Sequence, residues 1–212
     1  MFIELLDLLR CTNDHKDTWL VAAFKNVSNR FVLEATLGCP SCSAQYSIRD
    51  GVADFTGGTG QASPSPGRMA TSQQREELAT RAGAFLSATE PGATVILGGS
   101  WAEAAQELSV IGETRVLALN APPGIEGSET VALIRVASRI PVAPGSMLGV
   151  ALDHSFPSEI IASAVKAVRA GGRIVGPTSI AAPKELAVLA RDADYWVAEK
   201  APAVIKLSRA GR

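Results

Sequence analysis

The sequence predicts an α/β protein whose mostly parallel sheet ends in an antiparallel hairpin and is preceded by a small β-rich module. Three observations lead to this fold. Residues 1–55 contain all three cysteines of the 212-residue chain and few helix-length patterns. Residues 56–67, TGGTGQASPSPG, are nearly all small residues and proline, which is typical of a flexible linker. Over residues 68–212, apolar β-branched runs alternate with helix-length segments, which indicates parallel strands joined by helices.

The elements of the larger domain are expected in a regular order. It opens with an amphipathic helix over Met69–Thr89. Proline at position 157 suits the first turn of a later helix, because proline lacks the N–H that this turn leaves unpaired. The same patterns assign the remaining elements: strands Thr94–Leu97, Arg115–Leu119, Val131–Val136, Leu148–Leu152 and Arg173–Val175, helices Trp101–Val110, Pro157–Ala170 (stopped by Gly171 and Gly172) and Pro183–Ala190, and a closing hairpin of Tyr195–Ala198 and Val204–Leu207.

The composition excludes several classes of protein. Hydrophobic residues make up 47% of the chain, enough for a core, so global disorder is excluded. The 20 Lys and Arg balance 21 Asp and Glu, which leaves no basic field to hold a nucleic-acid backbone. Apolar runs are interrupted before about 18 residues, so no membrane-spanning helix is expected. Acidic residues in the opening MFIELLDLLR do not suit a signal peptide, and three cysteines do not make a disulfide scaffold, so a cytoplasmic protein is expected.

The cysteines of the N-terminal module have the spacing of a metal site. Cys39 and Cys42 form a CPSC motif, and Cys11 lies 28 residues upstream of it. Two such knuckles joined by two short strands are what a tetrahedral zinc ribbon requires. The three thiols supply three ligands for Zn²⁺. His15 is the expected fourth ligand because of its chemistry, and Asp14, which has the spacing of a second knuckle ligand, is the alternative.

Two other interpretations of the cysteines stay open. A redox pair prefers a strand-to-helix setting, whereas Cys42 is followed by the strand-like SAQYSI. A degenerate ribbon that has lost its metal would instead be stabilised by docking on the neighbouring domain.

The N-terminal module resembles the small zinc-ribbon proteins that activate tRNA, ribosomal RNA and translation-factor methyltransferases. Leu5–Cys11 (LLDLLRC), Leu37–Cys42 (LGCPSC) and Tyr46–Phe55 (YSIRDGVADF) are similar to that family's LLDxLxCPxC and LxCxxCGxxYPIxDGIPxL stretches. The Asp50-Gly51 turn follows the cysteines at the spacing of the family's pattern. Thr12 replaces the usual proline, and Asp14 replaces the second cysteine of the first knuckle. The resemblance implies a bound zinc ion.

The larger domain resembles the Rossmann-like methyltransferases that depend on S-adenosylmethionine. Three stretches carry the resemblance in the family's order: Thr94–Gly99 (TVILGG), Ile140–Asp153 (IPVAPGSMLGVALD) and Ala170–Gly176 (AGGRIVG). The first is similar to the family's first strand and its glycine turn. The resemblance implies S-adenosylmethionine as the cofactor.

The expected cofactor site departs from the family's pattern. The glycine turn consists of Gly98, Gly99 and Ser100, followed by Trp101 where a small residue is usual. Asn120 ends the second strand, where the family places an acid that accepts hydrogen bonds from both ribose hydroxyls. Only about ten residues, rich in Gly and Pro, then precede the third strand, too few for a full crossover helix. The candidate cofactor contacts are Gly98, Gly99, Ser100, Trp101 and Asn120.

His154 is the candidate catalytic residue, because it follows the fourth strand near the tip of a parallel sheet. Asp153 is the candidate group that orients it. Asp153 and Ser155 are also ordinary turn and capping residues before a helix that starts with proline.

The pattern favours a methyltransferase-like pseudoenzyme, a non-catalytic binding or scaffold protein. An active S-adenosylmethionine-dependent methyltransferase of unknown substrate is the alternative, so whether the chain is an enzyme stays open. Another nucleotide-binding α/β protein is a third hypothesis, although a single glycine pair does not favour NAD or ATP and no G-x-x-x-x-G-K-[ST] loop occurs. A protein partner or self-association is expected, with no membrane.

Overall fold

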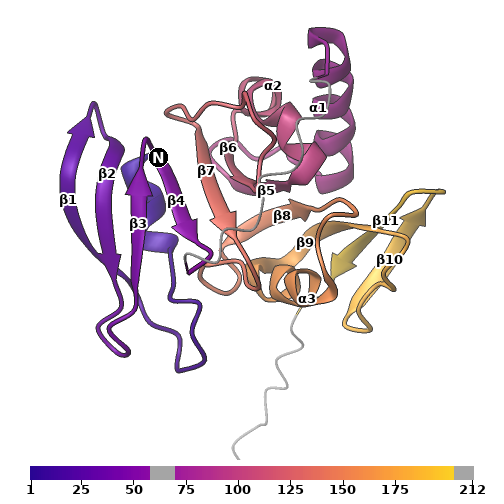
Figure 1. Cartoon of the computed structure of the whole chain (residues 1–212). Helices are drawn as coiled ribbons and strands as arrows, with labels where there is room; N and C mark the ends of the chain where they lie inside the picture. Colours follow the sequence, from indigo (N-terminus) through magenta and orange to yellow (C-terminus); the bar gives the residue numbers. More distant parts are fainter. Residues whose placement is uncertain (58–69, 203–212) are drawn as a thin grey trace, which may run out of the picture.

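The computed structural model describes residues 1–57 and 70–202. Within these ranges one sheet of eleven strands runs in the order β1-β2-β3-β4-β7-β6-β5-β8-β9-β11-β10 (Figure 1). The elements are, in chain order, η1 (Ile3–Leu8), β1 (Val21–Ser28), β2 (Phe31–Gly38), β3 (Gln45–Arg49), β4 (Val52–Phe55), α1 (Ser72–Leu86), β5 (Thr94–Gly98), η2 (Gly99–Ala104), α2 (Ala105–Ile111), β6 (Arg115–Leu119), β7 (Val131–Val136), β8 (Met147–Ala151), α3 (Ser158–Ala167), β9 (Val168–Pro177), β10 (Leu186–Arg191) and β11 (Tyr195–Lys200).

The N-terminal module extends the sheet of the larger domain. Strands β1 to β4 form an antiparallel meander. Strand β4 then pairs in parallel with β7, with Val52 opposite Leu133 and Phe55 opposite Val136. The two strands expected between the cysteine knuckles are therefore β1 and β2, and the module is joined to its neighbour by main-chain hydrogen bonds of a shared sheet.

The centre of the sheet is parallel, from β4 through β7, β6, β5 and β8 to β9. Helices α1 and α2 lie on one face, and α3 lies on the other (Figure 1). Strand β5 has β6 on one side and β8 on the other, so the winding direction of the chain reverses there. In open α/β sheets, ligands bind outside the carboxyl ends of the strands at such a reversal. The loops after β5 and β8 are therefore the expected place for a ligand.

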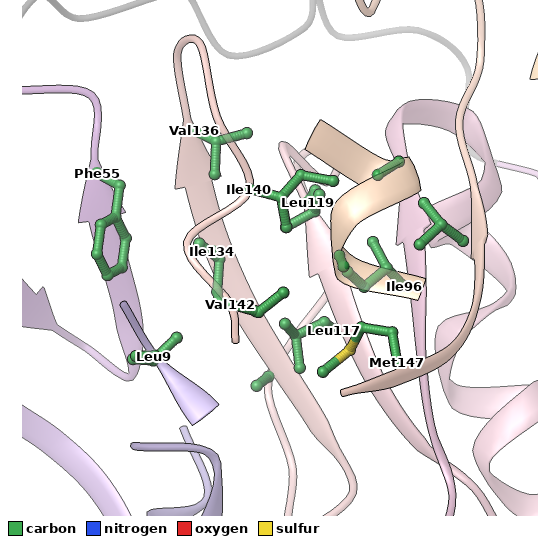
Figure 2. Packing of buried hydrophobic residues seen from close by; sticks show 14 of the residues in the cluster. Leu9, Phe55, Ile96, Leu117, Leu119, Ile134, Val136, Ile140, Val142 and Met147 are labelled. Atoms are coloured by element: carbon green, nitrogen blue, oxygen red, sulfur yellow. The ribbon is translucent and has the colours of Figure 1, made fainter. Parts of the chain in front are cut away.

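The larger apolar core joins both parts of the chain. Leu9 and Phe55 belong to the N-terminal module and lie beside Ile134, Val136 and Val142 in the same cluster (Figure 2). All five side chains are buried. At about 25 cal/mol per Å² of apolar surface buried, this shared core makes a substantial contribution to holding the module against β7.

Local sequence signals explain the ends of two helices. The Thr71 hydroxyl accepts a hydrogen bond from the Gln74 N–H, and the Gln74 side chain accepts one from the Thr71 N–H. This capping box satisfies two N–H groups at the start of α1. Pro157 stands just before α3 with a φ of −74°, close to the angle that its ring imposes.

The predicted α/β fold with its parallel centre and C-terminal antiparallel hairpin is confirmed. The predicted strands Arg115–Leu119 and Val131–Val136 match β6 and β7 residue for residue. No helix among residues 1–57 and 70–202 is both long and apolar enough to cross a bilayer. Most of the predicted linker, residues 58–67, lies outside the described residues, and the domain division there stays a prediction.

Two predictions about the C-terminal third were wrong. The helix expected over Pro183–Ala190 is replaced by β10, which pairs with β11, so tertiary pairing overrides the helical propensity of its Ala and Leu residues. The hairpin is therefore β10–β11, and Val204–Leu207 lies outside the described residues. Helix α3 ends at Ala167, before the glycine pair, which instead lies within β9.

The glycine pair has a structural role in β9. The register between β8 and β9 shifts between the pairs Met147–Val168 and Gly149–Arg173. Gly171 has a φ of +74°, and a Cβ on Gly172 would lie 2.4 Å from the Leu148 carbonyl oxygen. The irregular register thus requires glycine at both positions.

Candidate metal centre and candidate cofactor crevice

Three thiols and one imidazole converge in the N-terminal module. The donor atoms of Cys11, His15, Cys39 and Cys42 all lie within 4.8 Å of one another. Cys11 and His15 come from the loop before β1, and the other two come from the turn between β2 and β3. That turn is closed by hydrogen bonds between Cys39 and Ala44 and between Cys39 and Ser43. The antiparallel meander therefore brings two sequence-distant knuckles together.

The spacing of the donor atoms fits a tetrahedral metal. The Cys11 and Cys42 Sγ atoms are 3.6 Å apart, and the Cys39 Sγ atom lies 3.4 Å from His15 Nε2. A zinc ion with Zn–S bonds of about 2.3 Å places its ligand sulfurs roughly 3.8 Å apart. Three soft sulfurs and one imidazole nitrogen are also a donor set that zinc prefers.

The imidazole of His15 is oriented for ligation by its other nitrogen. Its Nδ1 lies 2.7 Å from the Lys16 carbonyl oxygen, which only accepts hydrogen bonds. In the neutral imidazole Nδ1 therefore carries the proton, which leaves the lone pair on Nε2, the atom that faces Cys39. Asp14 is exposed and does not belong to the group of converging donors. Of the two candidate fourth ligands, the structure brings His15 to the thiols.

The surroundings of the site favour a thiolate. A hydrogen bond from the Ala44 backbone, followed by bonds from Cys39, Cys11 and Asn13, lowers the pKa of Cys42 to about 6, against the smaller opposing effect of burial. The Tyr46 hydroxyl lies 3.2 Å from the Cys11 Sγ atom. Since a metal ligand has to be a thiolate, this environment suits metal binding.

The glycine turn after β5 is in contact with the loop after β8. The Asp153 carboxylate accepts a hydrogen bond from the Ser100 N–H at 2.6 Å. A Cβ on Gly99, whose φ is +64°, would lie 2.3 to 2.4 Å from the carboxylate atoms. A Cβ on Gly98 would lie 2.6 Å from Leu152 and 2.8 Å from Phe156. The two glycines thus provide room for the protein's own side chains.

Asp153 is buried and ionised in this position. Burial acts to raise the pKa of Asp153, but hydrogen bonds from the Ser100 N–H and from Ser155 outweigh it and lower the pKa below its usual value. Ser155 contributes both its N–H and its hydroxyl to the same carboxylate oxygen. The carboxylate therefore occupies the kind of backbone N–H site that binds anions at a strand-to-helix turn.

Trp101 fills the space beside the glycine turn. The residue is 1% exposed, and its ring contacts Phe85 and Tyr195 with centroid separations of 6.3 and 5.1 Å. The Arg81 guanidinium lies over all three rings at 5.1 to 5.7 Å and forms an ion pair with Asp192 at 2.8 Å. The stacked side chains therefore connect helix α1, the segment after the glycine turn and the β10–β11 hairpin.

His154 and Asp153 follow β8 as predicted, but their side chains have different partners. The His154 ring is exposed and stacks on Tyr195 with centroids 5.3 Å apart. The Asp153 carboxylate receives its hydrogen bonds from Ser100 and Ser155. The orienting contact expected between Asp153 and His154 is not among the hydrogen bonds of the described residues.

Asn120 uses its side chain within the fold. Its amide nitrogen donates to the Val136 carbonyl oxygen at 3.0 Å, and its amide oxygen accepts from the Val136 N–H at 2.9 Å. The residue has a φ of +47°, which asparagine tolerates better than most residues. The paired amide thus closes the ends of β6 and β7.

Sequence reasoning missed three residues that shape these sites. Tyr46 lies in the YSIRDG stretch that carried the ribbon resemblance, so a sequence motif could have identified it. No sequence motif identifies Arg81 or Tyr195, because their contact depends on how α1 packs against the β10–β11 hairpin.

Comparisons with known proteins give solved structures only, since no protein-family model and no curated protein matches the sequence. An S-adenosyl-L-methionine-dependent methyltransferase from Methanococcus maripaludis is 10% identical, with 62% of this chain and 86% of that chain covered and a TM-score of 0.44. MycE methyltransferase of the mycinamycin pathway, solved with Mg, S-adenosylhomocysteine (SAH) and mycinamycin VI, is 12% identical, with 64% and 49% covered and a TM-score of 0.45. Geranyl diphosphate C-methyltransferase from Streptomyces coelicolor is 14% identical, with 49% and 44% covered and a TM-score of 0.40. The chain covers less than half the length of the first structures that it resembles.

Proposed function

We propose that this chain is a non-catalytic methyltransferase-like protein, in which a zinc ribbon is built onto the edge of the sheet and the whole serves as a binding or scaffold unit. One observation carries the proposal. The Asp153 carboxylate occupies the N–H site of the glycine turn, where the resemblance to methyltransferases would place part of the cofactor.

The physical reason is both steric and electrostatic. The turn approaches Asp153 so closely that even one added carbon on Gly99 would overlap it. A cofactor's methionine part at this turn would have to displace a buried, ionised carboxylate from three hydrogen bonds. Each hydrogen bond to a charged group contributes about 1.5–3 kcal/mol, so the displacement is costly.

Two further residues support the same conclusion. Trp101 is buried in the space next to the turn, and its Nε1 has no hydrogen-bond partner among the described residues, so the ring is held there by packing. The amide of Asn120 is already paired with Val136 and carries no charge, so it is a poor partner for ribose hydroxyls. Tight binding of an adenosyl ligand is therefore not expected.

We propose Zn²⁺ as the occupant of the thiol cluster. Cys11, His15, Cys39 and Cys42 would complete a tetrahedral set, which leaves no open position for a substrate. The ion would therefore be structural. It would hold the loop before β1 against the β2–β3 turn and stabilise a module of about 55 residues that has a limited core of its own.

A binding role requires an accessible surface, and β1, an edge strand of the sheet that the described residues form, offers one together with the preceding Trp19. Trp19, Val21, Phe24 and Val27 are 70%, 65%, 48% and 42% exposed. A long apolar edge strand pairs readily with another strand. We propose self-association through β1, which sedimentation velocity over a range of concentrations would detect. Phe24→Lys should abolish the association, and a wild-type chain that stays monomeric at every concentration would contradict it.

Calorimetric titration tests the central proposal. SAH added to high micromolar concentration should give no saturable heat with the wild-type chain, and the melting temperature should not move. A methyltransferase that binds SAH serves as the control for the ligand. Saturable one-to-one heat, with a rise in melting temperature, would support the alternative of an active methyltransferase.

A further inference from the structure

A cavity lies over the carboxyl ends of β4, β7 and β6, and the glycine turn is not part of its lining. Its volume is about 460 Å³, within the range of about 300–1,000 Å³ that is usual for small-molecule sites. We infer that this cavity binds a small organic anion with a flat apolar body, held by the Arg135 guanidinium. The lining shares Asn120 with the candidate cofactor contacts, but it contains neither the glycine turn nor Trp101.

The floor of the cavity is built from three adjacent strands. Leu133 on β7 is paired with Val52 on β4 and with Ala118 on β6, and all three line the cavity. Arg135 is two residues beyond Leu133, so it belongs to the same face of β7, and it is exposed. Because β4 belongs to the N-terminal module, both parts of the chain contribute to this site.

The cavity exists because the connection between β6 and β7 is short. Helix α2 packs against these strands, but only an irregular loop joins them. This loop supplies Ala121, Pro122 and Ile125 to the wall, and it is fixed to α2 by a hydrogen bond from the Gln106 side chain to the Glu126 carbonyl oxygen at 2.8 Å. The loop side chains in this wall are thus apolar, and the loop is partly anchored before any ligand binds.

The polar side chains of the lining point to an anion. The Asn120 amide is paired with Val136, the Thr56 hydroxyl donates to Asp54, and the Ser155 hydroxyl donates to Asp153. Arg135 is the one charged residue of the lining among the described residues, and its side chain makes no ion pair or hydrogen bond with residues 1–57 or 70–202. A guanidinium beside apolar walls matches a carboxylate, sulfonate or phosphate on a ring system.

The experiment uses two fluorescent probes that differ in charge. 8-Anilinonaphthalene-1-sulfonate has a flat apolar body and one anionic group, and N-phenyl-1-naphthylamine is similar but neutral. We expect the anionic probe to bind the full chain at one saturable site. Arg135→Gln should lower the affinity for the anionic probe at least tenfold and leave the affinity for the neutral probe unchanged. Arg139 is an exposed arginine outside the lining, so Arg139→Gln should change neither affinity.

Two filling variants test the location. Ala121→Trp and Ile125→Trp place a large ring in the cavity from the loop, and either should prevent binding of both probes while melting cooperatively. Unchanged binding of the anionic probe in Arg135→Gln, or retained binding in a folded filling variant, would overturn the inference. Excess SAH should leave the probe bound, and displacement would overturn the site as separate from a cofactor site. Heat from SAH without displacement would contradict only the proposed function.

Discussion

The Asp153 carboxylate accepts a hydrogen bond from the Ser100 N–H at 2.6 Å and so joins the loops that follow β5 and β8. These are the loops between which an open α/β sheet binds its ligand. In an open crevice a ligand would accept the hydrogen bond from this N–H. Here the protein's own carboxylate accepts it. The same contact also stabilises the fold, and this effect is measurable.

Asp153→Asn should destabilise the protein in a pH-dependent way. The folded pKa of Asp153 lies below its usual value of 3.8, so the ionised carboxylate stabilises the folded state above about pH 4. This stabilisation is lost as the pH falls through the folded pKa. In urea unfolding, the free energy of unfolding of the variant should therefore be about 1–3 kcal/mol lower than that of the wild type at pH 7. This difference should shrink below about pH 4.

The control for this measurement is Asp194→Asn, an exposed carboxylate on the β10–β11 hairpin. Its free energy of unfolding should stay within about 0.5 kcal/mol of the wild type at pH 7. An equal deficit for Asp153→Asn at pH 7 and at pH 3 would show that the carboxylate is not held by these hydrogen bonds.

The metal centre predicts a contrast between two neighbouring positions. His15→Gln should lower the zinc content of the purified chain well below one ion, because it removes a donor nitrogen from the cluster. Asp14→Asn should leave the zinc content at one ion per chain. Elemental analysis measures both, and the melting temperature should fall with the metal. Loss of zinc in Asp14→Asn with retention in His15→Gln would reverse the ligand assignment.

Packing across the two parts of the chain predicts that they unfold together. Leu9 is fully buried in the shared core, so Leu9→Ala should cost about 2–5 kcal/mol. Leu189→Ala, at a residue that is 50% exposed, should cost less than about 0.5 kcal/mol. Tryptophan fluorescence and circular dichroism should follow one urea transition in both variants. Two separate transitions, of which Leu9→Ala shifts only one, would mean that the module unfolds independently.

Sequence patterns predicted those parts of the fold that local chemistry determines. The strands β6 and β7 were found at their correct ends because each is a short apolar run bounded by polar or turn residues. The cysteine spacing likewise predicted that Cys11, Cys39 and Cys42 converge, whereas His15 was preferred to Asp14 for its chemistry and not for its spacing.

The remaining features depend on contacts between distant segments. The strand β10 has a helical composition and is extended because β11 pairs with it. The parallel pairing of β4 with β7 could not be read from either segment, because no local signal specifies which edge strand a second module will extend. The Arg81 stack on Trp101 is of the same kind, since its members come from three separate elements.

The most direct test of the closed crevice is the structure of a crystal of the full chain that has been soaked in millimolar SAH. We predict that Trp101 stays packed against Tyr195 and that the Asp153 carboxylate stays on the Ser100 N–H, with no adenosyl density over the glycine turn. Density for the ligand seated over Gly99, with the indole rotated away and the carboxylate displaced, would contradict the proposal that this crevice is closed.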